Sequence, residues 1–310
     1  MKEAARQTRS YLMELFERHG FHPRTDLGQN FLIDLNLVEY IVRQAEVSSR
    51  DVVLEVGAGT GGLTTFLAQN AAHVVSVEVD RSMFQLAQEA VQSFPNVTLL
   101  NRDALRNKNT LDPEILQLVQ QQLRTEPGRR FKLVSNLPFN IATPVVSNLV
   151  ATDLPWERMV VTIQLELAQK MTAAPSSSQY GALSVWIQSQ CQAKILRKLA
   201  PTVFWPRPKV FSAILRISPD AERQRQIEDR EFFHDFLRRL FHQRRKFLRR
   251  VLVGMYRKQL EKCEVDAVLQ SLAIDQNTRA EQLDVETLVE LSNRLRRAIA
   301  DAGGPEPASR

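Results

Sequence analysis

The chain has 310 residues, of which 44% are hydrophobic and 25% are charged, and its net charge is +6 at pH 7. This composition is typical of a globular protein, and the length allows one large domain and a smaller one. The chain has no apolar run of about 18 residues and no secretory signal at residues 1–20, and its two cysteines, Cys191 and Cys263, lie far apart. We therefore expect a cytoplasmic protein without a membrane span, a disulfide framework or a metal site.

The first part of the chain predicts strands that alternate with helices. Near the N-terminus, a helical spacing joins Tyr11, Leu12, Leu15 and Phe16. Strands are then expected at 51–56, 73–80, 96–104 and 131–139, with helices at 62–71 and 81–94. Residues 158–171 begin as a strand and turn helical, and two further strands, at 195–201 and 208–218, are expected to form an antiparallel pair at one edge. This order predicts a parallel, doubly wound α/β sheet.

The second part of the chain is predicted to contain helices only. Residues 228–300 show no strand alternation, so we place the domain boundary in the polar stretch 218–226. The predicted domains are an α/β domain at 1–218 and an all-helical domain at 219–300, followed by a disordered tail at 301–310. Segment 103–131 is expected to be a solvated insertion that contains a surface helix.

Positive charge is concentrated in the predicted helical domain. The stretch from Phe236 to Lys258 contains nine Lys or Arg residues and no Asp or Glu. Its apolar residues follow a helical period, so one face packs and the other is positive. A solvated helix face is the simpler interpretation, but the absence of any acidic residue favours a surface that faces nucleic acid.

A glycine-rich turn follows the first predicted sheet strand. Gly57, Gly59 and Gly61 lie between that strand and a helix, where glycine permits a positive φ and close approach of a ligand. Glu78 ends the next strand, where its carboxylate can accept the hydroxyls of a ribose. Both a dinucleotide and S-adenosylmethionine (SAM) fit this pattern, and the G-x-G-x-G spacing favours SAM. Asp103, after the third strand, either accepts from an adenine amine or caps a helix.

The tetrapeptide Asn136-Leu137-Pro138-Phe139 ends the fourth predicted strand, at the carboxyl edge where open α/β sheets bind ligands. The Asn136 side-chain oxygen and the carbonyl of Leu137 or Pro138 can accept hydrogen bonds from an exocyclic base amine. Phe139 offers a face on which a base can stack. By itself, such a tetrapeptide is more simply interpreted as a strand-ending turn with a buried phenylalanine.

Together these residues resemble the KsgA family of ribosomal RNA adenine dimethyltransferases. The resemblance spans roughly residues 24–255 and rests on the motifs LGQNFL, LEVGAGTGGLT, VEVDRSM, RDAL, NLPFN, YGALSV, PKVFSA and FHQRRKFLRR. It implies a Rossmann-like SAM-dependent methyltransferase domain with a smaller all-helical C-terminal domain. It also implies dimethylation of two adjacent adenosines near the 3′ end of small-subunit ribosomal RNA, within an immature 30S particle, by a monomer.

The resemblance further implies roles for individual residues. The target base would be surrounded by Asn136, Pro138, Phe139 and Phe204, with Phe204 on the side opposite Phe139. Without the resemblance, Phe204 would be interpreted as a core aromatic. The cofactor would contact Gln29, Asn30, Leu32, Gly57, Gly59, Glu78, Asp103, Ala104 and Asn136. The RNA would contact Lys209, Arg244, Arg245, Lys246 and Arg249.

Three positions depart from the family pattern: Phe139 replaces a usual tyrosine, Leu165 a common lysine and Phe211 a usual aspartate. Two other functions share these features. A large-subunit ribosomal RNA methyltransferase of the antibiotic-resistance type would share the cofactor site, and a non-enzymatic nucleic-acid-binding factor would share the fold. The long helical C-terminal domain argues against the first, and the intact Glu78, Asp103 and Asn136 argue against the second.

Overall fold

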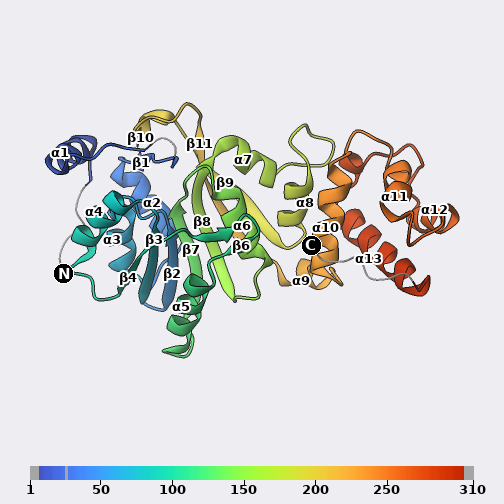
Figure 1. The fold of residues 1–310 in the computed structure, drawn as a ribbon, viewed down its shortest axis with the longest axis horizontal. Coiled ribbons are helices and arrows are strands. Elements are labelled where there is room, and N and C mark those ends of the chain that lie inside the picture. The colour runs from blue at the N-terminus through green and yellow to red at the C-terminus, as the bar shows by residue number, and fades with distance from the viewer. Residues whose placement is uncertain (1–6, 25–26, 304–310) are drawn as a thin grey trace. The chain divides into compact units, whose positions relative to one another are not determined.

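The structure is a computed structural model that describes residues 7–24 and 27–303 (Figure 1). The described residues form two compact units. One comprises the chain up to Ala168 together with Lys194–Pro219, and the other comprises Gln169–Ala193 and the chain from Asp220 onward. The sequence placed Gln169–Ala193 in the α/β domain, whereas in the structure it groups with the C-terminal helices. The reason is apolar burial, since Trp186 is buried with its ring 4.7 Å from that of His234.

The first unit is built on a seven-stranded sheet with the order β4-β3-β2-β7-β8-β11-β9. Its strands are β2 (Asp51–Val56), β3 (His73–Glu78), β4 (Val97–Asn101), β7 (Arg130–Asn136), β8 (Trp156–Gln164), β9 (Cys191–Leu199) and β11 (Ser212–Pro219). The strands from β4 to β8 pair in parallel, whereas β11 runs antiparallel to β8. The predicted Rossmann-like α/β class is confirmed, and the two late strands are neighbours at one edge of the sheet.

Helices flank the sheet where the sequence pattern places them. All six residues of β2 are buried, so both faces of the sheet are covered. The side chains of Asp34, Asp80 and Asp112 each begin a helix by accepting a backbone N–H. The helices are α1 (Arg9–His19), α2 (Leu35–Gln44), α3 (Gly62–Ala68), α4 (Arg81–Val91), α5 (Pro113–Arg124), α6 (Ala142–Ala151) and α7 (Leu165–Met171), whose last residues belong to the second unit.

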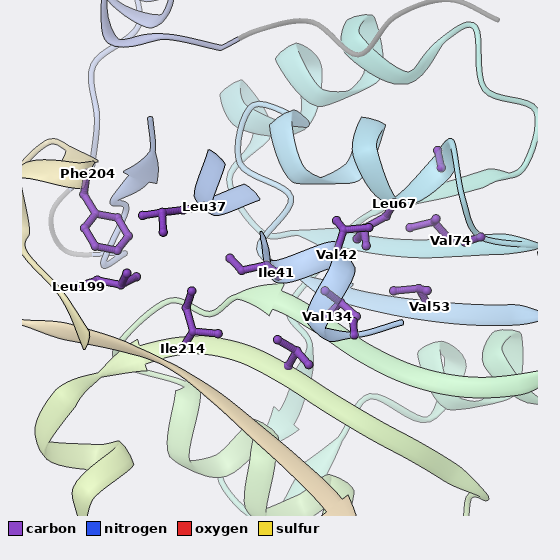
Figure 2. Close-up of a cluster of buried hydrophobic side chains, with 14 residues drawn as sticks. Leu37, Ile41, Val42, Val53, Leu67, Val74, Val134, Leu199, Phe204 and Ile214 are labelled. Carbon is purple, nitrogen blue, oxygen red and sulfur yellow. The ribbon is translucent and has the colours of Figure 1, made fainter. Parts of the chain in front are cut away.

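A buried apolar cluster joins α2 and α3 to one face of the sheet (Figure 2). Leu37 of α2 lies beside Phe204 at one end of the cluster, together with Leu199 and Ile214, and Val134 of β7 lies near Val42 and Val53 at the other end. Phe204 belongs to β10 (Phe204–Trp205), which follows a short 3-10 helix at Pro201–Val203 and pairs with β1 (Phe31–Leu32). The predicted N-terminal helix is present as α1.

Segment 103–131 is more firmly packed than a solvated insertion. It forms a hairpin of β5 (Leu105–Asn107) and β6 (Thr110–Leu111), followed by the expected helix, α5. Ile115 and Val119 of α5 are buried, and this helix packs against β2, β3 and β7. The apolar spacing of α5 therefore covers part of the sheet, and only its other side faces solvent.

The second unit is helical. Its elements are α8 (Ala182–Gln188), α9 (Ala221–Arg225), α10 (Arg230–Phe241), α11 (Leu248–Tyr256), α12 (Lys262–Ser271), a 3-10 turn at Ala280–Gln282 and α13 (Val285–Asp301). The basic stretch 236–258 is divided by a turn at 242–247, which the uninterrupted helical period did not predict. Helix α13 continues to Asp301, and residues 304–310 of the predicted tail lie outside the described residues.

The described residues contain neither a helix that could span a membrane nor a group of side chains that could hold a metal ion. None of the helices in 7–24 and 27–303 is long and apolar enough to cross a membrane. Within the same residues, no group of three or more His, Cys, Asp or Glu side chains could hold a metal ion.

Candidate active site

A cavity opens at the carboxyl ends of β2, β3, β4 and β7 in the first unit. Its empty volume is about 850 Å³, counted with the part open to solvent. The walls include ten of the residues predicted to bind cofactor or base: Gln29, Asn30, Gly57, Gly59, Glu78, Asp103, Ala104, Asn136, Pro138 and Phe139. Leu32 instead lines an adjoining cavity that shares Gly57, Gly59 and Asn136 with the first.

The glycine turn lies so close to Pro138 that a side chain at Gly57 would crowd the proline ring. Gly57 has a φ of 85°, and its N–H donates to the Val77 carbonyl at 2.8 Å. A Cβ at Gly57 would lie 3.0 Å from the Pro138 ring, which is closer than real Cβ contacts allow without a shift. The turn after β2 and the turn after β7 therefore touch directly, and glycine is required at their contact.

Glu78 presents a buried carboxylate to the cavity. Glu78 is only 6% exposed. Its carboxylate accepts the Gly59 N–H at 2.8 Å and the Asp80 N–H at 2.9 Å. Burial raises the pKa of the Glu78 carboxyl, and these two backbone donors oppose the rise. Each carboxylate oxygen keeps capacity for a further hydrogen bond, so Glu78 can accept two vicinal hydroxyls.

Asn136 is held in one orientation. Its Nδ2 donates to the Asn30 carbonyl at 2.8 Å, so the amide oxygen Oδ1 remains as the acceptor of this side chain. Next to it, the Leu137 N–H donates to the Thr162 carbonyl at 3.1 Å, and the Pro138 carbonyl accepts the Ile141 N–H at 3.1 Å. Because the turn uses the Pro138 carbonyl, that of Leu137 is favoured as the second acceptor for an amine.

Asp103 stands at the mouth of the cavity, and its side chain is exposed. Its Oδ1 accepts the Leu105 N–H at 2.9 Å, and the short strand β5 follows. The helix-cap interpretation is therefore wrong, because no helix begins there. Ala104 is 4% exposed, and its carbonyl accepts the Asp112 N–H at 2.9 Å, which ties this wall to the start of α5.

Gln29 offers a donor without a partner. Its Oε1 accepts the Arg24 N–H at 2.7 Å, whereas its buried Nε2 has no hydrogen-bond partner among the described residues. A buried amide that lacks a partner is costly unless a ligand satisfies it. Asn30, beside it, donates from Nδ2 to the Gly28 carbonyl at 2.9 Å, so the loop is ordered by its own side chains.

Phe204 does not line the cavity. It is 1% exposed and packs among Leu37, Leu199 and Ile214 in the core cluster (Figure 2). Its ring contributes to the core through apolar burial, so the structure favours the core-aromatic interpretation over a ring that flanks the base.

The predicted RNA contacts differ in their surroundings. In the first unit, Lys209 is exposed. In the second, Arg244 donates to the Ser178 and Tyr180 carbonyls, 3.2 Å each, and Arg249 forms a two-bond ion pair with Asp266 at 2.6 and 2.8 Å. Arg245 and Lys246, in the turn between α10 and α11, are exposed, and within the described ranges neither side chain forms a hydrogen bond or ion pair. Of the four predicted contacts in the second unit, these two cations are the ones available to a polyanion.

Val79 and Arg102 are among the cavity residues that were not predicted from the sequence. Val79, directly after Glu78, is 50% exposed and offers apolar surface on the wall. Arg102 follows β4 and forms ion pairs with Glu114 at 2.6 Å and Asp112 at 3.2 Å. Both come directly after parallel strands, so the strand-end rule that identified Glu78 and Asn136 could have identified them too.

Comparisons of the sequence with known proteins identify its family. The family model described as "Ribosomal RNA adenine dimethylase" matches residues 20–297. "Ribosomal RNA small subunit methyltransferase A" of Pediococcus pentosaceus is 38% identical over 91% of this chain and 92% of its own length. The protein of the same name from Halothermothrix orenii is 33% identical over 94% of each chain.

Solved structures share the fold. A dimethyladenosine transferase from Plasmodium falciparum has a TM-score of 0.70 and 22% identity, covering 87% of this chain and 97% of that one. The 23S rRNA methyltransferase ErmE has a TM-score of 0.60 and 23% identity, covering 86% and 99%. By its sequence, the chain belongs to the ribosomal RNA adenine dimethylase family, which is a family of SAM-dependent methyltransferases.

Proposed function

We propose that this protein uses SAM to dimethylate two adjacent adenosines near the 3′ end of small-subunit ribosomal RNA, within an immature 30S particle. The observation that carries the proposal is one cavity in which Glu78 and Asn136, from different strands, meet the glycine turn. Family membership supports the reaction, and the names of the relatives support the small subunit as the substrate. We further propose that the protein acts as a monomer in the cytoplasm, where that RNA is found.

The residues of the cavity fit SAM. Glu78 would accept the ribose hydroxyls, and Asp103 would accept from the adenine amine with its free oxygen. Gly57 lines the cavity and would lie against the methionine part, where the unpartnered Gln29 Nε2 would find an acceptor. When bound, SAM supplies a methyl group on a sulfonium, and transfer to an amine leaves a neutral thioether and releases one proton.

The remaining chemistry is positioning. The exocyclic amine of adenine is a poor nucleophile because its lone pair is delocalised into the ring. Asn136 Oδ1 and the Leu137 carbonyl would accept hydrogen bonds from the amine and so favour its pyramidal, reactive form. Phe139 would stack on the base after it leaves the RNA helix, a step that costs a few kcal/mol. No strong base is required, because the methyl donor is already activated.

The direct test is incubation with labelled SAM and immature small subunits, followed by digestion of the RNA and detection of dimethyladenosine. Large subunits, assayed in parallel, separate the proposal from the resistance-type function. Absence of SAM binding by calorimetry would instead favour the non-enzymatic factor.

Asn136→Ala should lower the rate of methyl transfer by about 100-fold or more, by analogy with removal of one preorganised hydrogen-bonding group from other active sites. A matched control is Asn148→Ala, because Asn148 Nδ2 also donates to a carbonyl, that of Lys108 at 3.3 Å, but does not line the cavity. Single-turnover rates for both variants measure the effect. A wild-type rate for Asn136→Ala would remove this residue from the reaction.

A further inference from the structure

A basic segment borders the sheet edge at which the cavity opens. Lys194–Pro219 contains six Lys or Arg residues and no Asp or Glu. Lys198, Arg207 and Lys209 are all exposed, and within 7–24 and 27–303 no hydrogen bond or ion pair engages Arg207 or Lys209. Such a surface is complementary to a polyanion.

Phe211 is the exposed aromatic of this segment. It precedes β11 and is 47% exposed, and the neighbouring Val210 is 44% exposed. Lys198, near the end of β9, places its Nζ 4.4 Å from the centre of the Phe211 ring. A half-exposed ring with an ammonium group beside it suits a ligand that offers both a flat face and negative charge.

Hydrogen bonds place Phe211 at the same edge as the cavity. The Phe211 carbonyl accepts the Leu165 N–H at 2.9 Å, and the Thr162 carbonyl accepts the Leu137 N–H at 3.1 Å. Thr162 and Leu165 are three residues apart, so these two attachment points lie about 10 Å from each other along the chain. An RNA strand whose adenosine enters the cavity therefore brings its neighbouring nucleotides over this segment.

We propose that Phe211 and Lys198 form a stacking platform for a nucleotide next to the target adenosine. The inference rests on the proposed function. The base of that nucleotide stacks on the Phe211 ring, and its phosphates lie near Lys198, Lys209 and Arg207. Withdrawal of the target adenosine from the RNA helix unstacks its neighbours, and the platform replaces part of the stacking that they lose.

The test compares wild type with four variants in methyl transfer from labelled SAM to immature small subunits. Phe211→Leu keeps the apolar bulk but loses the ring, and should raise KM for the particle by about fivefold or more. Phe211→Tyr keeps the ring and should stay near wild type. Lys198→Met should lower the slope of log affinity against log salt by about one. Arg50→Met, at the opposite edge of the sheet, should leave that slope unchanged. SAM affinity by calorimetry should be the same in all five proteins.

The outcomes separate this inference from the proposed function. If the wild type transfers methyl groups and Phe211→Leu has the same KM, the platform is wrong and the proposed function stands. If the wild type transfers none, both fail. If Phe211→Leu weakens binding to particles but not to their protein-free RNA, the ring contacts a ribosomal protein, and the inference is overturned. If Lys198→Met and Arg50→Met have equal slopes of log affinity against log salt, Lys198 does not contact the RNA. Its charge would then only protect an edge strand from pairing with another strand.

Discussion

At the scale of single residues, the cavity depends on a contact between two turns that lie far apart in sequence. Gly57 touches Pro138, and Asn136 is oriented by Asn30. In each contact, one residue can be recognised from the local sequence pattern, whereas the position of its partner depends on the tertiary fold. Substitutions at these contacts should therefore affect ligand binding more than stability.

Gly57→Ala should weaken SAM binding by about tenfold or more, because the added Cβ would push Pro138 and narrow the cavity. Gly128→Ala is the matched control. Gly128 has a similar φ of 82°, but a Cβ there would meet nothing within 4 Å. Both variants should lose about 1 kcal/mol of stability from the strained backbone, while calorimetry should find weaker SAM binding only for Gly57→Ala. Equal SAM affinities would show that Pro138 gives way.

Glu55 should make stability depend on pH. It is 1% exposed, and its Oε2 accepts the Thr64 and Ser76 hydroxyls at 2.6 Å each. Burial raises the pKa of the Glu55 carboxyl from its ordinary 4.5 to about 8, against the opposing effect of these hydroxyls. The folded protein thus holds this proton more tightly than the unfolded chain. Its stabilising contribution is complete below the unfolded pKa and is lost as pH rises toward 8.

Glu55→Gln removes the titrating carboxyl group, so the free energy of unfolding of the variant should decline less as pH rises. Wild type should lose up to about 1.4 kcal/mol of unfolding free energy per pH unit, relative to the variant, between about pH 5 and 8. Urea unfolding at a series of pH values measures the difference. Parallel pH profiles would indicate that the Glu55 carboxyl is already ionised in the folded protein at neutral pH.

At the scale of elements, the turn between α10 and α11 separates structural cations from available ones. The Arg244 side chain is bound to the backbone of its own unit, and that of Arg249 is paired with Asp266, whereas the side chains of Arg245 and Lys246 have no such partners within the described residues. The basic stretch is therefore not a uniform binding face.

Reversing both free charges, with Arg245→Glu and Lys246→Glu, should weaken binding to small subunits by about tenfold or more and leave the melting temperature unchanged. Arg244→Met provides the contrast. It should lower the melting temperature, because it leaves the Ser178 and Tyr180 carbonyls without their donor. Filter binding and calorimetry distinguish the two effects. Unaltered particle affinity in the double variant at physiological salt would mean that the turn is merely solvated.

At the scale of the whole molecule, the net charge of +6 predicts that affinity for the particle falls as salt rises, because bound cations release counterions from the RNA. Between about 50 and 200 mM salt the loss should be about tenfold or more. SAM affinity should change little over the same range, since the proposed ligand carries no phosphates. A salt-independent particle affinity would place the binding energy in uncharged contacts.

The order of strands and helices, the glycine turn, and the placing of Glu78 and Asn136 at one sheet edge could all be predicted from the sequence. They depend on local periodicity and on the rule that parallel strands end together. The burial of Phe204, the grouping of Gln169–Ala193 with the C-terminal helices, and the separation of Arg244 and Arg249 from Arg245 and Lys246 were decided only by the tertiary structure. Burial and pairing depend on partners distant along the chain, such as Leu37 for Phe204 and Asp266 for Arg249, and local spacing carries no information about them.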